Sequence, residues 1–296
     1  MPRQLKLGLA LGAGGTKGAA HVGVLRVLEH AGIRPDVIAG TSVGSLYGGA
    51  FAVGRTAAEM EDGIRTCPPN DVIQFFRHRL KIRHRNRLAR RFYEALAGWN
   101  IEDLPIKYAA TASDIVERGP VAIDRGPIID AIEASIAIPV IARPVLYQGR
   151  YLLDGGFWDS APVDAAVGLG ADVVVAVELG KPLSLPEVCH RPAAWIAGRL
   201  AKAALHRTIA GVPFTLHAAT TPLKPGRTAQ LVIRPRGISR IRGNSPFHMV
   251  DVLEAGIAAA EAALPSIKAL LAGEPLPAEA TELIANPKLA TDLGAT

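Results

Sequence analysis

The stretch LKLGLALGAGGTKG, residues 5–18, opens the part of the sequence that decides the fold. An apolar run, Leu5–Leu11, ends in a cluster of glycines, and hydrophobic residues then recur at helical spacing up to Gly32. A second apolar run, DVIA at residues 36–39, leads into GTSVG at residues 40–44 and a further helix of small residues. This order of strand, glycine loop, helix, strand, sharp turn and helix predicts parallel strands covered by helices.

The rest of the chain continues this alternation. Further strands are expected at residues 107–113, 119–124, 150–154, 172–178 and 231–234. Helices are expected at residues 128–136 and 249–271, the second interrupted by Pro265. We therefore expect an α/β three-layer sandwich with a central, mostly parallel sheet. Residues 5–272 are expected to form a single domain, and residues 273–296 a mobile C-terminal tail rich in Pro, Ala and Glu.

Composition excludes several classes of protein. The 296 residues are 49% hydrophobic and 20% charged, which excludes disorder as the main state. The two cysteines cannot build a disulfide framework or a cysteine-rich zinc site, which is typical of an intracellular protein. No group of His, Cys and Asp has metal-ligand spacing, so no metal or other cofactor is implied. No apolar run approaches the roughly 20 residues that span a bilayer.

The net charge of +6 predicts an anionic partner. Basic residues crowd residues 77–91, which form either a solvated helix face or a surface that contacts anionic lipid headgroups. Residues 193–209 have apolar and basic residues interleaved, typical of a core-facing helix or of an interfacial one. Nucleic acid is not expected, because only 5% of the residues are aromatic. We expect a cytoplasmic protein, peripheral to the inner face of a membrane.

Gly40-Thr-Ser-Val-Gly44 fits the G-x-S-x-G pattern of a nucleophile elbow. In such an elbow a serine lies on a tight turn from strand to helix, and small neighbours allow the close packing. The turn exposes the hydroxyl at a helix N-terminus, where developing negative charge is favoured. The alternative is a glycine-flanked helix cap in which Ser42 has no catalytic role.

Two other glycine motifs lie at predicted strand ends. The loop Gly12–Gly18 has exposed backbone N–H groups that can bind a dinucleotide pyrophosphate, form an oxyanion hole, or only make a tight turn. Asp154-Gly155-Gly156 places a carboxylate where it can act as a general base toward Ser42. The alternative is that Asp154 only forms an Asx-turn, in which its side chain caps the nearby backbone.

The three motifs together resemble those of patatin-like phospholipases, particularly the compact bacterial members. In that family a G-G-G-x-[K/R]-G loop, a G-x-S-x-G elbow and a D-G-[G/A] motif follow one another in this order. The resemblance covers roughly residues 5–178 and includes the sequences ASIAIP at residues 134–139 and LLDGGFWDSAPV at residues 152–163. One departure is Ala13, which stands where the family often has the first glycine.

The resemblance implies a serine hydrolase with a Ser-Asp dyad. Ser42 is then the nucleophile and Asp154 the base, with backbone amides of Gly14, Gly15 and Thr16 forming the oxyanion hole. Glycines and one lysine support these motifs: Gly12, Lys17, Gly18, Gly40, Gly44, Gly155 and Gly156. The implied substrate is the acyl ester of a phospholipid, lysophospholipid or neutral lipid, although a small soluble ester stays open. A dyad base must be partly desolvated, so we expect a raised pKa for Asp154.

Three other functions compete with this interpretation. A dinucleotide-binding oxidoreductase needs an acidic residue at the end of the second strand, but Asp36 lies before that strand. An α/β-hydrolase with a histidine base has His190, His206, His217 and His248 available after Asp154. A non-catalytic membrane-binding module would use the basic residues 77–91. The intact positions 42 and 154 favour the hydrolase over that module.

Overall fold

The computed structural model of the chain describes residues 5–78, 81–83, 86–139, 141–180, 220–222, 229–243 and 245–276. Nine strands within these residues form one mixed sheet in the order β5-β6-β3-β2-β1-β7-β9, while β4 pairs with β3 and β8 pairs with β4. The strands are β1 (Leu7–Leu11), β2 (Val37–Thr41), β3 (Lys107–Asp114), β4 (Gly119–Ile123), β5 (Val145–Tyr147), β6 (Arg150–Asp154), β7 (Val173–Val177), β8 (Thr220–Pro222) and β9 (Leu231–Ile233).

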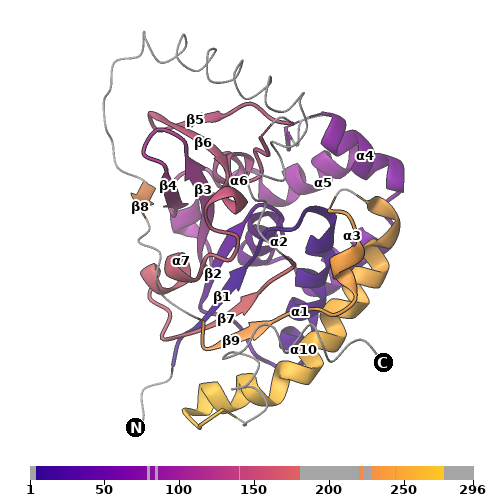
Figure 1. Cartoon of the computed structure of the whole chain (residues 1–296), viewed down its shortest axis with the longest axis vertical. Coiled ribbons are helices and arrows are strands. Elements are labelled where there is room, and N and C mark those ends of the chain that lie inside the picture. Colours follow the sequence, from indigo (N-terminus) through magenta and orange to yellow (C-terminus); the bar gives the residue numbers. More distant parts are fainter. Residues whose placement is uncertain are drawn as a thin grey trace.

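Helices flank this sheet (Figure 1). They are α1 (Ala19–His30), α2 (Val43–Ala52), α3 (Ala57–Arg65), α4 (Pro69–Arg77), α5 (Arg87–Leu96), α6 (Ile128–Ser135), α7 (Val163–Gly168) and α10 (Met249–Ala272). Short 3-10 turns lie between them: η1 (Gly15–Gly18), η2 (Ile101–Asp103), η3 (Gly155–Phe157), η4 (Ile238–Arg240) and η5 (Pro246–His248). The expected α/β three-layer fold is confirmed.

The sheet has a parallel half and an antiparallel half. Strands β3, β2, β1, β7 and β9 run parallel, as the alternation of strands and helices predicts. Beyond them, β6 and β4 pair antiparallel with β3, and β5 pairs antiparallel with β6. The central strands β1, β2 and β7 are buried along their whole length, which explains their apolar sequences.

The two faces of the sheet differ in the size of their side chains. On one face Leu7, Leu9 and Leu11 belong to the main core together with α1, α2 and α10. On the other face Ala10 packs in a smaller cluster with α7. A Cβ atom at Gly8 would lie 2.6 Å from the Cβ of Ala171, so only small residues allow the chain around α7 to pack this closely. Helices α1, α2 and α10 thus pack on a leucine-rich face of the sheet, and α7 packs on a face of small residues.

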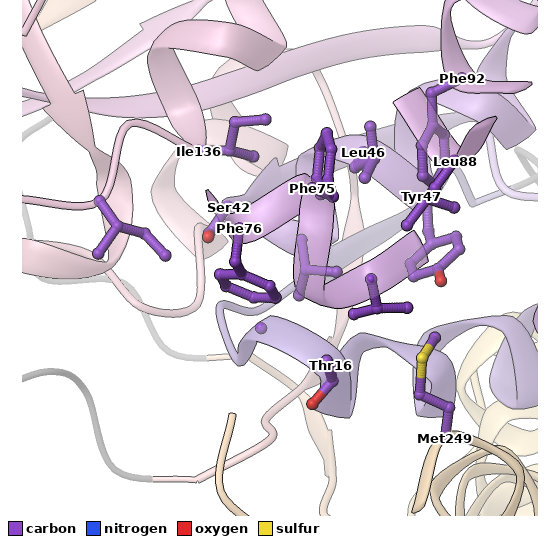
Figure 2. Close-up of a pocket in the computed structure, with 14 residues that line it drawn as sticks. Thr16, Ser42, Leu46, Tyr47, Phe75, Phe76, Leu88, Phe92, Ile136 and Met249 are labelled. Carbon is purple, nitrogen blue, oxygen red and sulfur yellow. The ribbon is translucent and has the colours of Figure 1, made fainter. Parts of the chain in front are cut away.

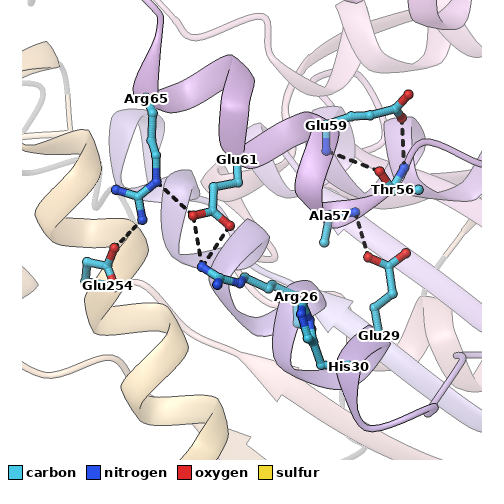
Figure 3. A network of polar contacts seen from close by, with 9 residues as sticks. All are labelled: Arg26, Glu29, His30, Thr56, Ala57, Glu59, Glu61, Arg65 and Glu254. Atoms are coloured by element: carbon cyan, nitrogen blue, oxygen red, sulfur yellow. Dashed lines mark hydrogen bonds and ion pairs between the residues drawn. The ribbon is translucent and has the colours of Figure 1, made fainter.

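Helix α10 lies along α1 because glycines allow close contact. A Cβ at Gly23 of α1 would lie 2.4 Å from the carbonyl oxygen of Leu253, and one at Gly256 of α10 would lie 2.3 Å from that of Ala20. Polar contacts join the same helices to α3 (Figure 3): Arg65 binds both Glu61 and Glu254, and Arg26 binds Glu61 at 2.9 Å. The long C-terminal helix is therefore tied to the N-terminal half of the sequence.

One expectation for this helix was wrong. Pro265 does not interrupt it, and α10 continues to Ala272, where Gly273 ends it with a φ of 72°. Proline removes only one backbone hydrogen bond, and the packing of α10 on α1 and of Ile267 in the core keeps the helix intact. The helical segment Pro246–Ala272 is also long and apolar enough to cross a membrane, by length and composition alone. The proposed tail boundary at residue 273 stays a prediction.

Candidate active site

Ser42 lies at the sharp turn between β2 and α2, as the G-x-S-x-G pattern predicts. Its backbone has φ 55° and ψ −122°, a conformation that non-glycine residues rarely adopt. The flanking glycines make the turn possible: a Cβ at Gly40 would lie 2.5 Å from the carbonyl oxygen of Gly44, and one at Gly44 would lie 2.0 Å from that of Leu11. The turn brings the hydroxyl to the end of the parallel strands.

Asp154 reaches Ser42 through the register of β3. Thr41 at the end of β2 is opposite Thr111 of β3, and Asp154 at the end of β6 is opposite Ala112. The antiparallel β6 therefore ends at the level where β2 also ends, with β3 between them. The Ser42 hydroxyl donates a hydrogen bond to Oδ2 of Asp154 at 2.5 Å.

The carboxylate of Asp154 is almost completely enclosed, with 1% of the residue exposed. Its Oδ1 accepts the backbone N–H of Gly156 at 2.8 Å. Burial raises the pKa of Asp154 to about 6, although the hydrogen bonds from Ser42 and Gly156 act in the opposite direction. Gly155 is needed here because a Cβ would lie 2.2 Å from the carbonyl oxygen of Thr111. The raised pKa agrees with the expectation for a desolvated base.

The elbow has a support that the sequence did not identify. Ser135, the last residue of α6, accepts the backbone N–H of Ser42 at its Oγ, 2.9 Å away. The same hydroxyl donates to the carbonyl oxygen of Thr111 at 2.7 Å. A separate contact inside the turn joins the Ser45 hydroxyl to the Ser42 carbonyl at 2.6 Å. Ser135 thus ties the strained residue to β3. The only feature of the sequence that could have pointed to Ser135 is its place within ASIAIP, the family-like stretch at residues 134–139.

Part of the glycine loop lies beside the same site, because Gly15 and Thr16 line a cavity together with Ser42. The N–H of Gly12 donates to Val177 at 3.0 Å, and that of Ala13 donates to Ser160 at 2.8 Å. The N–H of Thr16 donates to the carbonyl oxygen of Gly243 at 2.7 Å, so this amide already has an acceptor. Within the described part of the chain, the N–H groups of Gly14 and Gly15 have no acceptor.

Two titratable side chains, one in the loop and one on α1, affect the loop. His21 is fully buried on α1, and its Nε2 lies 2.7 Å from the carbonyl oxygen of Gly12. Burial lowers the pKa of His21 to about 4, so the ring is neutral and Nε2–H donates to this carbonyl. Partial burial also lowers the pKa of Lys17. Gly18 approaches α2 so closely that a Cβ there would lie 2.2 Å from Cγ2 of Val43.

A largely apolar cavity opens from Ser42 (Figure 2). Its empty space, including the open mouth, is about 520 Å³. The lining residues come from η1, the elbow, α4, α5, the chain after α6 and the start of α10: Gly15, Thr16, Ser42, Val43, Leu46, Tyr47, Val72, Phe75, Phe76, Leu88, Phe92, Ile136, Ile138 and Met249. The hydroxyl of Ser42 therefore lies beside a largely apolar cavity.

The residues that the oxidoreductase and the α/β-hydrolase alternatives would use are not at this site or are not described by the structure. Asp36 accepts the backbone N–H of Leu7 at 2.8 Å, so its carboxylate ties β1 to the start of β2. His248 is exposed and contacts Asp251 at 3.2 Å. The other three candidate histidines and residues 193–209 lie outside the described residues. No group of three or more potential metal ligands occurs in the part of the chain that the structure describes.

Comparisons with known proteins agree with this geometry. A family model described as patatin-like phospholipase matches residues 9–167. An NTE family protein of Mycobacterium tuberculosis is 34% identical over 177 residues, which are 59% of this chain and 49% of the relative. Lysophospholipase nte1 of Aspergillus fumigatus is 32% identical over 181 residues, or 59% of this chain and 12% of the relative.

Among solved structures, VipD of Legionella pneumophila has a similar fold, with a TM-score of 0.50 and 15% identity over 89% of this chain and 67% of the other. The chain thus spans half or less of the curated relatives that it matches. The family match includes the glycine loop, Ser42 and Asp154 and covers more than half of the sequence. The chain belongs to the patatin-like phospholipase family.

Proposed function

We propose that this chain is a lipid acyl hydrolase in which Ser42 and Asp154 form a catalytic dyad. The observation that carries the proposal is the 2.5 Å hydrogen bond between the Ser42 hydroxyl and the buried Asp154 carboxylate. A base with a pKa near 6 is ionised at neutral pH and still able to accept a proton. The apolar cavity beside Ser42 suits the acyl chain of a lipid ester.

The reaction then has two steps. Asp154 accepts the Ser42 proton while Oγ attacks the ester carbonyl, and the N–H groups of Gly14 and Gly15 stabilise the oxyanion. Asp154 next gives its proton to the leaving alcohol, which leaves an acyl group on Ser42. In the second step Asp154 takes a proton from water, the resulting hydroxide attacks the acyl carbonyl, and Ser42 recovers its proton as the fatty acid leaves. Lys17 adds positive charge near the loop.

The substrate class follows from the family and from the named relative. The Aspergillus protein is a lysophospholipase, and we propose lysophospholipids, phospholipids or neutral lipids as substrates here. Residues 5–272 would form a single hydrolase domain. We further propose a cytoplasmic protein that contacts the inner face of a membrane. Within residues 77–91 acidic neighbours already bind Arg83 (Asp130 at 2.6 Å) and Arg90 (Glu94 at 2.6 Å), so only some of these cations would contact lipid headgroups.

Labelling with a fluorophosphonate tests the dyad, and a panel of lipid esters tests the substrate class. A single adduct is expected on Ser42 and none in Ser42→Ala. Asp154→Asn should label slowly, because its amide cannot accept the proton. The control is Ser266→Ala, since Ser266 lies on α10 and does not line the cavity. Folded protein without an adduct on Ser42, or hydrolysis that survives in Ser42→Ala, would contradict the proposal.

A further inference from the structure

Exposed apolar side chains occur next to the residues that line the cavity. Phe247 is 72% exposed, the highest value among the large hydrophobic residues described, and lies two positions before the lining residue Met249. Val250, 38% exposed, follows Met249 directly. Ile73 on α4 is 39% exposed and lies next to the lining residue Val72. Exposed apolar side chains therefore occur in the same segments of the chain that line the cavity.

These side chains belong to neighbouring elements. Helix α4 packs against η5, and α10 begins directly after η5 and also contacts η1. Figure 2 shows Phe76, Thr16 and Met249 around the cavity, one from each of α4, η1 and α10. Ile73, Phe247 and Val250 thus belong to neighbouring elements beside the cavity. An exposed apolar patch beside a cavity is typical of a binding surface.

Two arginines add positive charge to the same region. Arg77 lies four residues after Ile73, on the same side of α4, and is exposed. Arg242 is exposed as well, and its carbonyl oxygen lies 3.5 Å from Oγ1 of Thr16, a cavity-lining residue. Neither guanidinium has an acidic partner among the described residues. The neighbouring acidic groups of α10 do have partners, since Asp251 contacts His248 and Glu254 binds Arg65.

We define the mouth patch as Ile73, Arg77, Arg242, Phe247 and Val250, and we propose that it docks on the surface of an anionic lipid bilayer. Phe247 inserts among the acyl chains, and the two arginines bind headgroup phosphates. The combination of apolar anchors with unpaired cations fits an anionic lipid surface better than an apolar protein groove. The proposal rests on the proposed function, because docking there would let a lipid ester enter the cavity directly from the bilayer.

Vesicle binding tests the patch without turnover of lipid. The full chain with Ser42→Ala is sedimented with vesicles of phosphatidylcholine alone or mixed with phosphatidylglycerol. We expect binding to the mixed vesicles, and Phe247→Ser should weaken it about tenfold, because one large apolar side chain no longer leaves water. Arg77→Ser should weaken binding to the anionic vesicles about fivefold. The matched control is Leu146→Ser, since Leu146 is 53% exposed on β5 and does not line the cavity.

The results separate docking from catalysis. No binding to anionic vesicles, unchanged binding of Phe247→Ser, or an equal loss in Leu146→Ser would overturn the proposal. Hydrolysis of a soluble short-chain ester by the unaltered protein tests the proposed function separately. If binding depends on Phe247 but that ester is not hydrolysed, docking stands and the proposed function fails. If the ester is hydrolysed but Phe247→Ser binds vesicles normally, the proposed function stands and this patch is not the docking surface.

Discussion

The carbonyl oxygen of Gly243 accepts the backbone N–H of Thr16 at 2.7 Å. Gly243 lies outside residues 9–167, the part of the chain that the family model matches. It also packs against the neighbouring residue of the loop, since a Cβ at Gly15 would lie 2.0 Å from the Gly243 carbonyl oxygen. The segment before α10 therefore fixes the loop whose remaining amides, Gly14 and Gly15, are the proposed oxyanion donors.

Gly243→Ala should lower kcat and change KM little. The added Cβ would lie 3.1 Å from the carbonyl oxygen of Gly14, so the peptide between Gly14 and Gly15 must shift. Loss of one oxyanion donor typically costs a factor of about 100–1,000 in kcat, and a misdirected donor should cost about tenfold or more. Kinetics on a soluble ester measure both constants. Gly168→Ala is the control, because nothing lies within 4 Å of its Cβ position, and an equal kcat in the two variants would contradict the prediction.

Ser135→Ala should lower both stability and kcat. The substitution leaves the buried N–H of Ser42 without its acceptor, which costs about 1–3 kcal/mol of unfolding free energy. The strained elbow also loses its link to Thr111, so the Ser42 hydroxyl should be held less firmly toward Asp154. Urea unfolding and ester kinetics measure the two effects. Ser113→Ala is a useful comparison, because its hydroxyl makes only a 3.4 Å contact with Gly155, and it should lose less in both assays.

The motifs that contain Ser42, Asp154 and the glycine loop could be found in the sequence because each motif is a short, local pattern. Gly40 and Gly44 permit the strained serine through contacts with chain that is close in sequence or in the adjacent strand. The parallel strands were also predictable, since their apolar runs alternate with helical patterns. The antiparallel position of β6 was not, because pairing with β3 depends on register between distant segments.

The supports of the site could not be read from the sequence for the same reason. Ser135, His21 and Gly243 each bind a backbone group of the site, and a single serine, histidine or glycine has no pattern that identifies such a contact. The expectation that Thr16 donates to an oxyanion likewise ignored an acceptor that lies more than two hundred residues away. Hydrogen bonds between residues distant in the sequence thus could not be predicted from the motifs.

The pH dependence of hydrolysis should report the ionisation of Asp154. Its pKa of about 6 predicts that kcat/KM is constant above about pH 7 and falls about tenfold per unit well below pH 6, because only the carboxylate accepts the Ser42 proton. A soluble ester followed across this range measures the profile. If kcat/KM fell only near pH 4, where an exposed aspartate titrates, burial would not raise the pKa of Asp154 as proposed.

Asp154→Asn should be more stable than the unaltered protein at neutral pH, although it should be inactive. The folded pKa of Asp154 is raised from 3.8 to about 6, so folding disfavours its charged form. Its favourable contribution to the unfolding free energy is present below about pH 3.8 and is lost as pH rises through 6, by up to about 3 kcal/mol. Urea unfolding at about pH 4 and about pH 8 tests this, because the advantage of the asparagine should appear only at the higher pH.

His21 should have the opposite effect on stability. Its folded pKa is lowered from 6.5 to about 4, so its contribution is fully present above about pH 6.5 and is lost as pH falls through 4, by up to about 3 kcal/mol. His21→Gln removes this acid sensitivity and can still donate an N–H to Gly12, whereas His21→Leu removes both. Relative to the unaltered protein, both variants should therefore gain stability as pH falls from about 6.5 to about 4, but only His21→Leu should lose kcat.

Urea unfolding between about pH 4 and pH 7 and ester kinetics at neutral pH separate these two roles of His21. The control is His30→Gln, at the exposed end of α1, whose stability should depend on pH in the same way as that of the unaltered protein. Equal kcat in His21→Gln and His21→Leu would mean that the bond to Gly12 does not position the oxyanion loop. Because Asp154 and His21 shift stability in opposite directions between about pH 4 and pH 6, their effects nearly cancel in the unaltered protein, and only the single variants reveal them.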